Sequence, residues 1–177
     1  MNESSMGAEK NIDKLVEQLS SQEMLERIEA REALVEIGPT VIPAVSNLAD
    51  SPDPHVRWEC AKALANIADV SSIDTLIKLL EDTEEGTRWD AALGLIAIGK
   101  PAVTPVLRAV ISRSVGYTII SGARHVMHEL SQTNWGGVLR PVYKALNSSQ
   151  ASVSGPVAAS KALEEWEYGD LSHATGK

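Results

Sequence analysis

The segment RWECAKALANI, residues 57–67, decides the fold, because its pattern returns 31 residues later as RWDAALGLIAI, residues 88–98. Both copies read Arg-Trp-x-x-Ala-x-x-Leu-x-x-Ile, and each is followed by a short polar break and another apolar run. Self-similarity at a fixed period of this length is typical of a solenoid of stacked repeats. Because stacked repeats build long surfaces that usually bind other molecules, the pattern favours a binding function over a catalytic one.

Five copies of the pattern fit the chain. The apolar anchor of each second helix falls at Leu34, Leu64, Leu95, Met127 and Leu163. This spacing predicts helical hairpins at about 11–38, 39–69, 70–99, 100–132 and 133–168, with flexible polar tails at about 1–10 and 169–177. Gly38 and Gly99 are expected to end helices, and the glycines at 136 and 137 indicate a loop around 133–137. The predicted fold is a single all-α domain, a right-handed α–α superhelix.

Composition agrees with a folded helical chain. Of the 177 residues 44% are apolar and none is Phe, so small aliphatic side chains must fill the interior, which suits closely stacked helices. Sixteen Lys and Arg against 24 Asp and Glu give a net charge of −8, which opposes binding of nucleic acid. There is no run of about 20 apolar residues and no secretory signal in residues 1–7, so we expect no membrane association. The single Cys60 is expected in the core, and the chain in a reducing cytoplasm.

Residues 50–67, which read Asp-x-x-Asp-x-x-Val-Arg-x-x-Cys-Ala-x-Ala-Leu-x-x-Ile, are similar to the HEAT-repeat family. The resemblance is strongest to a short-repeat subgroup first associated with phycobilin lyases, and it covers about residues 11–167. It implies that the second helices line a concave surface. The family includes scaffolds, adaptors and a few enzymes, so the resemblance indicates a fold more specifically than a function. Units four and five depart from the pattern, because they lack the Arg and the full Ala pair.

The outward row of the second helices supplies the candidate binding residues. Helical spacing places Trp58 and Trp89 opposite the core stripe, beside Ala61, Ala65 and Ala92, which would leave shallow pockets. The predicted partner-binding residues on this row are Trp58, Trp89, Ile28, Arg31, Ile96, Arg124 and His128. The row is apolar at its first end and basic further along. Two interpretations stay open: the tryptophans contact a ligand, or each lies flat over the next repeat with its N–H bonded.

Reactive clusters are scarce. Arg124-His125-x-x-His128-Glu129 could offer two or three metal ligands on one helical face, but the sequence places no further His or Cys beside them, so we predict no metal site. The repeats also resemble those of deoxyhypusine hydroxylases, iron enzymes that rely on several His-Glu pairs at repeat spacing. Only His128-Glu129 occurs here. Arg57 and Arg88 each follow an acidic turn and are expected to tie adjacent turns together rather than to bind a ligand.

We therefore expect a non-enzymatic protein-interaction scaffold or adaptor that binds a helix or peptide in its concave groove, with no catalytic residue and no cofactor. The acidic chain favours a basic or amphipathic partner. The alternative implied by the resemblance is a phycobilin-lyase-like or regulatory subunit that handles a tetrapyrrole. A HEAT-type nucleic-acid enzyme would need a basic concave surface, which the overall charge opposes.

Overall fold

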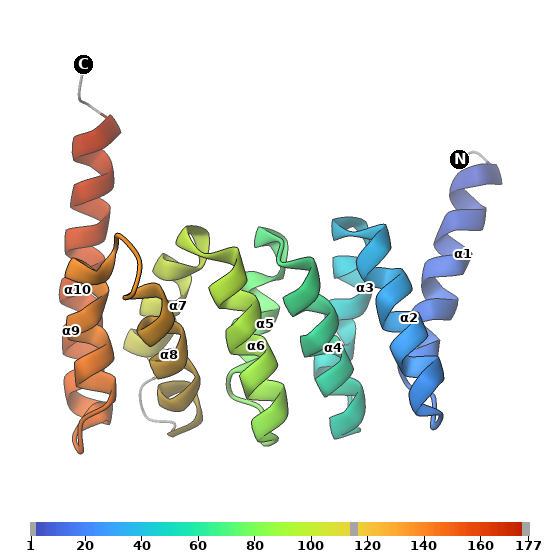
Figure 1. Cartoon of the computed structure of the whole chain (residues 1–177), viewed down its shortest axis with the longest axis horizontal. Coiled ribbons are helices and arrows are strands. Elements are labelled where there is room, and N and C mark those ends of the chain that lie inside the picture. Colours follow the sequence, from blue (N-terminus) through green and yellow to red (C-terminus); the bar gives the residue numbers. More distant parts are fainter. Residues whose placement is uncertain (1–2, 114–116, 175–177) are drawn as a thin grey trace.

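Stacked helices make up the structure (Figure 1), a computed structural model that describes the backbone of residues 3–113 and 117–174 and the side chains of 11–112 and 118–168. Within these ranges every regular element is helical, which confirms the predicted all-α solenoid. The α-helices are α1 (Glu3–Gln18), α2 (Met24–Ile37), α3 (Ile42–Ser46), α4 (Pro54–Ile67), α5 (Ile73–Leu79), α6 (Glu85–Ile98), α7 (Lys100–Arg113), α8 (Tyr117–Leu130), α9 (Gly136–Leu146) and α10 (Ala151–Ala174). Short 3₁₀ turns at Pro39–Val41, Asn47–Asp50 and Val70–Ser72 extend α3 and α5.

The helices form two layers. The first helices of the predicted hairpins, α1, α3, α5 and α7, make one layer, which we call the A layer. The second helices, α2, α4, α6 and α8, make the B layer, which lies in front in Figure 1. Each B helix packs on the B helices before and after it as well as on its own A helix. Most of its circumference is therefore buried, and only a narrow outward strip faces solvent.

A residue with positive φ ends each of the first three B helices. Gly38 (φ 84°), Ala68 (φ 51°) and Gly99 (φ 75°) follow α2, α4 and α6, and they are the positive-φ residues of the described part of the chain. A left-handed residue terminates a helix and redirects the chain, here from the B layer back to the A layer. The predicted stops at Gly38 and Gly99 are confirmed.

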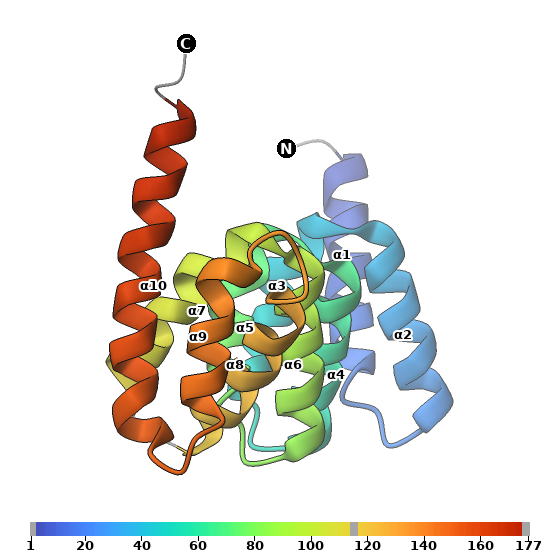
Figure 2. The same cartoon turned by 60° about the vertical axis from the view of Figure 1, so that its left-hand side comes forward.

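The last hairpin is reversed. No positive φ follows α8 in the described residues, and the chain passes through a short turn at 131–135 into α9, which packs beside α8 in the B layer. Helix α10 then packs along α7 in the A layer (Figure 2). The prediction that Leu163 anchors a second helix therefore assigned the two helices of unit five, at 133–168, to the wrong layers. The turn at 131–135 differs from the ends of α2, α4 and α6, where a positive-φ residue precedes the crossing to the A layer.

One continuous apolar core runs through the stack. The predicted anchors Leu34, Leu64, Leu95 and Met127 are each 0% exposed, and each such burial contributes roughly 1.5–3 kcal/mol. Leu163, the fifth predicted anchor, is only half-buried because α10 belongs to the other layer. The predicted loop at 133–137 is shorter than expected, because α9 already begins at Gly136.

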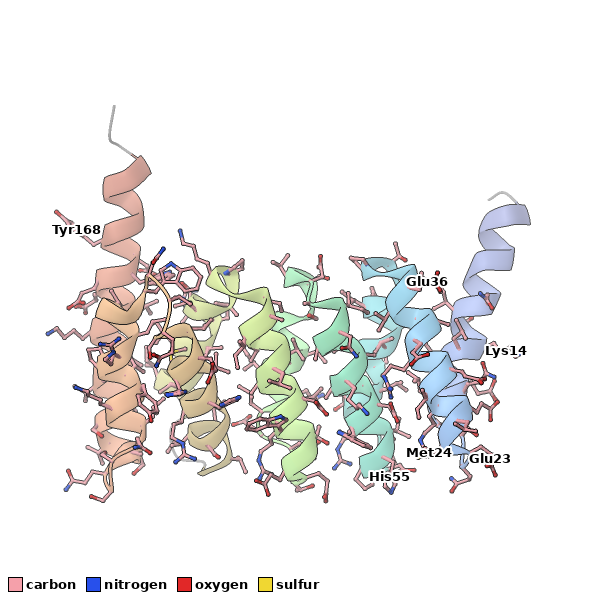
Figure 3. The ribbon with its side chains drawn as sticks, viewed as in Figure 1. Lys14, Glu23, Met24, Glu36, His55 and Tyr168 are labelled. Carbon is pink, nitrogen blue, oxygen red and sulfur yellow. The ribbon has the colours of Figure 1, made fainter. Side chains whose placement is uncertain are left out.

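The predicted tails are helical where they are described. Helix α1 begins at Glu3, and α10 continues to Ala174 and projects beyond the stack (Figures 1 and 2). Polarity alone suggested flexibility at 1–10 and 169–177, but a helix already nucleated by packing gains one hydrogen bond for each added residue. Residues 1–2 and 175–177 lie outside the described residues. Figure 3 shows Met24 at the foot of α2 and Tyr168 on the projecting part of α10, both exposed.

Candidate functional site

Trp58 occupies a closed site on the B layer. Its indole Nε1–H donates to Asp90 Oδ2 on the next helix, α6, at 2.6 Å. Lys62 Nζ lies over the ring, 4.2 Å from its centroid. The ring is half-buried against α6 at Gly86, where an added Cβ would stand 3.6 Å from Nε1. Trp58 therefore matches the second of the two interpretations that the sequence left open, because it lies over the neighbouring repeat with its N–H bonded.

The shallow pocket predicted beside Trp58 does not form, whereas Ala92 beside Trp89 lines the cavity described below. Ala61 is 0% exposed and Ala92 is 1% exposed. The Cα of Ala65 lies 3.0 Å from where a Cβ on Gly94 of the next B helix would stand. On a single helix these alanines lie opposite the apolar stripe, but in a stack the sides of each B helix pack against its neighbours.

Trp89, the repeat equivalent of Trp58, is open. It is 53% exposed, and one ring face stacks on the imidazole of His125 in α8, with centroids 4.3 Å apart and planes 20° apart. No described residue accepts a hydrogen bond from its indole N–H. In the next repeat, Gly122 occupies the position that corresponds to Asp90. Leu93 occupies the position that corresponds to Lys62 of unit two. Both groups that close Trp58 are therefore missing around Trp89.

Gly122 cannot simply be replaced by an acceptor. A Cβ there would lie 2.7 Å from Leu80 Cδ2, so the glycine is needed for the close approach of α8 to the end of α5. Packing of the A layer and openness of the Trp89 site are thus coupled through one residue.

A cavity of about 320 Å³ lies beside the exposed indole, between α6, α8 and α9. We call it the aromatic pocket. Its lining side chains include Trp89, His125, His128, Tyr143, Arg88, Arg124, Glu85 and Asn147. His128 and Tyr143 meet in a tilted contact with ring centroids 4.8 Å apart, which joins α8 to α9. His128 Nδ1 also lies 2.9 Å from Glu129 Oε1, and this pair orients the imidazole.

A second cavity of about 350 Å³ adjoins the first and reaches the turn between α9 and α10. We call it the serine pocket, because Ser121, Ser148, Ser149 and Ser152 line it. Arg124 borders both cavities. It is exposed, and its only described hydrogen bond is a long one, 3.4 Å from Nη1 to Asn147 Oδ1. Its guanidinium can therefore turn toward a ligand in either cavity.

The imidazole of His125 is half-buried behind Trp89. Burial lowers its pKa below the usual value, the charges of His128 and Arg124 lower it further, and Glu129 opposes them. Its Nε2 is buried and makes no hydrogen bond to any described residue. The imidazole thus forms a flat backing for Trp89.

Three of the seven predicted binding residues line the aromatic pocket: Trp89, Arg124 and His128. The other four, Trp58, Ile28, Arg31 and Ile96, do not. Arg31 Nη1 donates to Glu59 Oε2 at 2.5 Å, and its side chain is 11% exposed, so this cation already has a buried partner. Ile28 and Ile96 are half-buried. Tyr143 and Asn147 were not predicted, because they come from α9, whose place in the B layer no repeat pattern indicates.

Metal and thiol chemistry find little support. Across the described residues no group of three or more His, Cys, Asp or Glu side chains could hold a metal ion. Cys60 is 0% exposed, as predicted, with Sγ 3.2 Å from the Val45 carbonyl oxygen, and burial raises its pKa to about 12. A thiol in this state is a poor nucleophile.

The predicted arginine ladder is present at Arg57. Its Nε and Nη2 donate to the two oxygens of Asp82 at 2.6 and 3.0 Å, and Nη1 donates to the Ser51 carbonyl oxygen at 3.0 Å. Arg88 Nη1 bonds to the carbonyl oxygens of Asp82 and Thr83, both at 2.8 Å. Arg57 thus ties two turns together, whereas Arg88 anchors only the turn before its own helix.

Within the described helices none is long and apolar enough to span a membrane. Deoxyhypusine hydroxylase of Drosophila melanogaster is 36% identical over 72 residues, which are 40% of this chain and 24% of that protein, so the chain spans about a quarter of its relative. Among solved structures, an engineered protein aligns with 88% of this chain and 47% of its own (23% identity, TM-score 0.42). A designed armadillo repeat protein aligns over 88% and 87% (20% identity, TM-score 0.41).

A sequence profile described as HEAT repeats matches two overlapping stretches, residues 12–76 and 63–128. Together they cover more than half of the chain and include α2, α4, α6 and most of α8. The matched stretches end before α9, where the reversal of the last hairpin begins. The chain belongs to the HEAT-repeat family.

Proposed function

We propose that this chain is a non-enzymatic protein-interaction module that binds a segment of a partner protein in the aromatic pocket. The observation that carries the proposal is the exposed, unpaired indole of Trp89 on a layer where the equivalent Trp58 is closed. A rigid aromatic side chain beside a cavity is how many protein interfaces anchor their partners.

The size of the site fits one or two partner side chains. The two adjoining cavities, about 320 and 350 Å³, share Ser121, Arg124 and Asn147 in their linings. An extended peptide or one turn of a helix could place an apolar side chain against Trp89 and polar groups along the serine pocket. The stack of packed helices presents the site on a rigid frame, which limits the entropy lost on binding.

Enzymatic alternatives draw less support from the site. The part shared with deoxyhypusine hydroxylase is too small to carry over its activity, and a single His-Glu pair stands at the pocket. A tetrapyrrole-handling role remains the alternative of a different class. A change in the absorption spectrum of an added bilin that depends on Trp89 would favour it over peptide binding.

The test is affinity capture from the native lysate with wild type and Trp89→Ala as baits. We expect one or more proteins to be captured by the wild type and lost, by about thirtyfold in affinity, with the variant. Leu25→Ala is the matched control, because Leu25 is an exposed apolar residue of the B layer, on α2, that does not line the pocket. Equal capture by all three baits would contradict the proposal.

A further inference from the structure

Charge is divided unevenly along the chain. Residues 1–90 contain 19 Asp and Glu against eight Lys and Arg. Residues 91–163 contain seven Lys and Arg against one acid, Glu129. The net charge of −8 therefore conceals a basic segment at 91–163, which contains α8 and α9 and ends before four acids at 164–170.

The basic residues of this segment differ in whether they form ion pairs. On the A side, Arg108 in α7 pairs with Glu167 at 3.1 Å, and Lys161 in α10 pairs with Glu165 at 3.8 Å. On the B layer, Arg124, Arg140 and Lys144 are exposed and make no described ion pair. The sole acid there, Glu129, bonds to His128.

Resting on the function proposed above, we infer that the partner is an acidic peptide segment with an apolar side chain next to its carboxylates. The apolar side chain packs on the exposed face of Trp89, and a carboxylate pairs with Arg124, which borders both cavities. Guanidinium and carboxylate groups form strong, directional hydrogen bonds. The overall charge favoured a basic partner, but affinity depends on the charges that face the partner in the site.

Nucleic acid fits the site less well than an acidic peptide. A strand of phosphates needs a continuous basic track, whereas the pocket offers two arginines, and Arg88 is already bonded to two carbonyl oxygens. Glu85 also lines the pocket and interrupts any continuous basic track across it. A peptide with one or two carboxylates makes no such demand.

The test is selection of short random peptides on the immobilised full chain. We expect the enriched peptides to be acidic and to share an apolar residue. Their affinity should fall about tenfold or more with Arg124→Glu and with Trp89→Ala. Arg108→Glu is the matched control, since it makes the same charge change in the same segment on the opposite layer. Raising the salt from about 0.1 to about 1 M, which shortens the Debye length from about 10 to about 3 Å, should also weaken binding.

The outcomes separate this inference from the function on which it rests. Peptides that depend on Trp89 but are basic or neutral would overturn the acidic partner and leave the interaction module standing. An equal loss with Arg108→Glu and Arg124→Glu would also overturn the role of Arg124. If no enriched peptide depends on Trp89, both proposals fail. Binding of a labelled oligothymidylate that depends on Arg124, without enriched peptides, would replace the peptide by nucleic acid.

Discussion

Trp58 and Trp89 begin the same motif in consecutive repeats, yet one closes a helix interface and the other stands open. The difference lies outside the motif, in the next repeat. Asp90 accepts the N–H of Trp58, while Gly122, one unit on, has no side chain to accept that of Trp89. In a stack, whether a residue is covered or open therefore depends on which residue the next repeat places against it.

The largest contrast is expected from removing each ring. Trp58→Ala should lower the free energy of unfolding by about 3 kcal/mol, because it empties a packed site and strands the Asp90 carboxylate. Trp89→Ala should lower it by about 1 kcal/mol or less, since only a stack on His125 is lost. Urea unfolding of both variants measures the difference. Equal losses would mean that the two sites are packed alike.

Partner binding should show the reverse order. Peptide affinity should fall with Trp89→Ala, whereas Trp58→Phe, which keeps an aromatic ring but removes the donor to Asp90, should leave it unchanged. Fluorescence anisotropy with a selected peptide provides the measurement. A loss with Trp58→Phe would show that the closed site also contributes to binding.

The arginines beside the tryptophans extend the comparison to the turns. Arg57→Ala should destabilise by about 2 kcal/mol, because Asp82 loses a bidentate partner in a pair whose side chains are 15% and 4% exposed. Arg88→Ala, which removes bonds to two carbonyl oxygens, should cost about 1 kcal/mol. Thermal and urea unfolding test the order. A larger loss at Arg88 would show that the ladder does not depend on the carboxylate.

The carboxylates Asp82 and Asp90 should respond to pH in opposite directions. Burial raises the pKa of Asp82, but hydrogen bonds from Arg57 and the Glu84 N–H outweigh it, so the pKa lies below its usual value. Its stabilising contribution is present above the usual carboxyl pKa and is lost as pH falls. Burial raises the pKa of Asp90, and the bond from Trp58 only partly offsets this. Its contribution is greatest at low pH and is lost as pH rises through the raised pKa.

Two substitutions check these directions between about pH 3 and pH 7. Asp82→Asn should remove the gain in stability with rising pH. Asp90→Asn should remove the loss of stability with rising pH. The asparagine side-chain oxygen can still accept a hydrogen bond from the Trp58 N–H. An unchanged pH profile of stability in either variant would show that the replaced carboxylate does not cause the pH dependence.

The smallest expected effect concerns His125 behind Trp89. Because its pKa is lowered mainly by burial, the folded chain binds fewer protons than the unfolded chain just below the usual value of 6.5. Stability should therefore fall as pH drops from 6.5 toward the lowered pKa, and His125→Gln should flatten that part of the curve. A profile that stays the same in the variant would show that this imidazole is not desolvated by the stack.

Much of the fold could be predicted from the sequence, because the signals for the helices and their buried anchors are local and repeated. The period located the buried anchors Leu34, Leu64, Leu95 and Met127, and the glycines located two helix ends. The same period failed for Leu163, which it placed on a second helix although α10 belongs to the A layer. Layer assignment depends on where the chain turns, and the missing left-handed residue after α8 leaves no clear mark in the sequence.

The sequence by itself determined the all-α stack, the buried position of Cys60 and the uneven division of charge along the chain, since each follows from residue type and spacing. Only the tertiary structure decided which tryptophan is open and that Tyr143 and Asn147 complete its pocket. These features arise from contacts between repeats. A helix's own pattern identifies its apolar stripe, but its exposed strip is whatever the neighbouring helices leave uncovered.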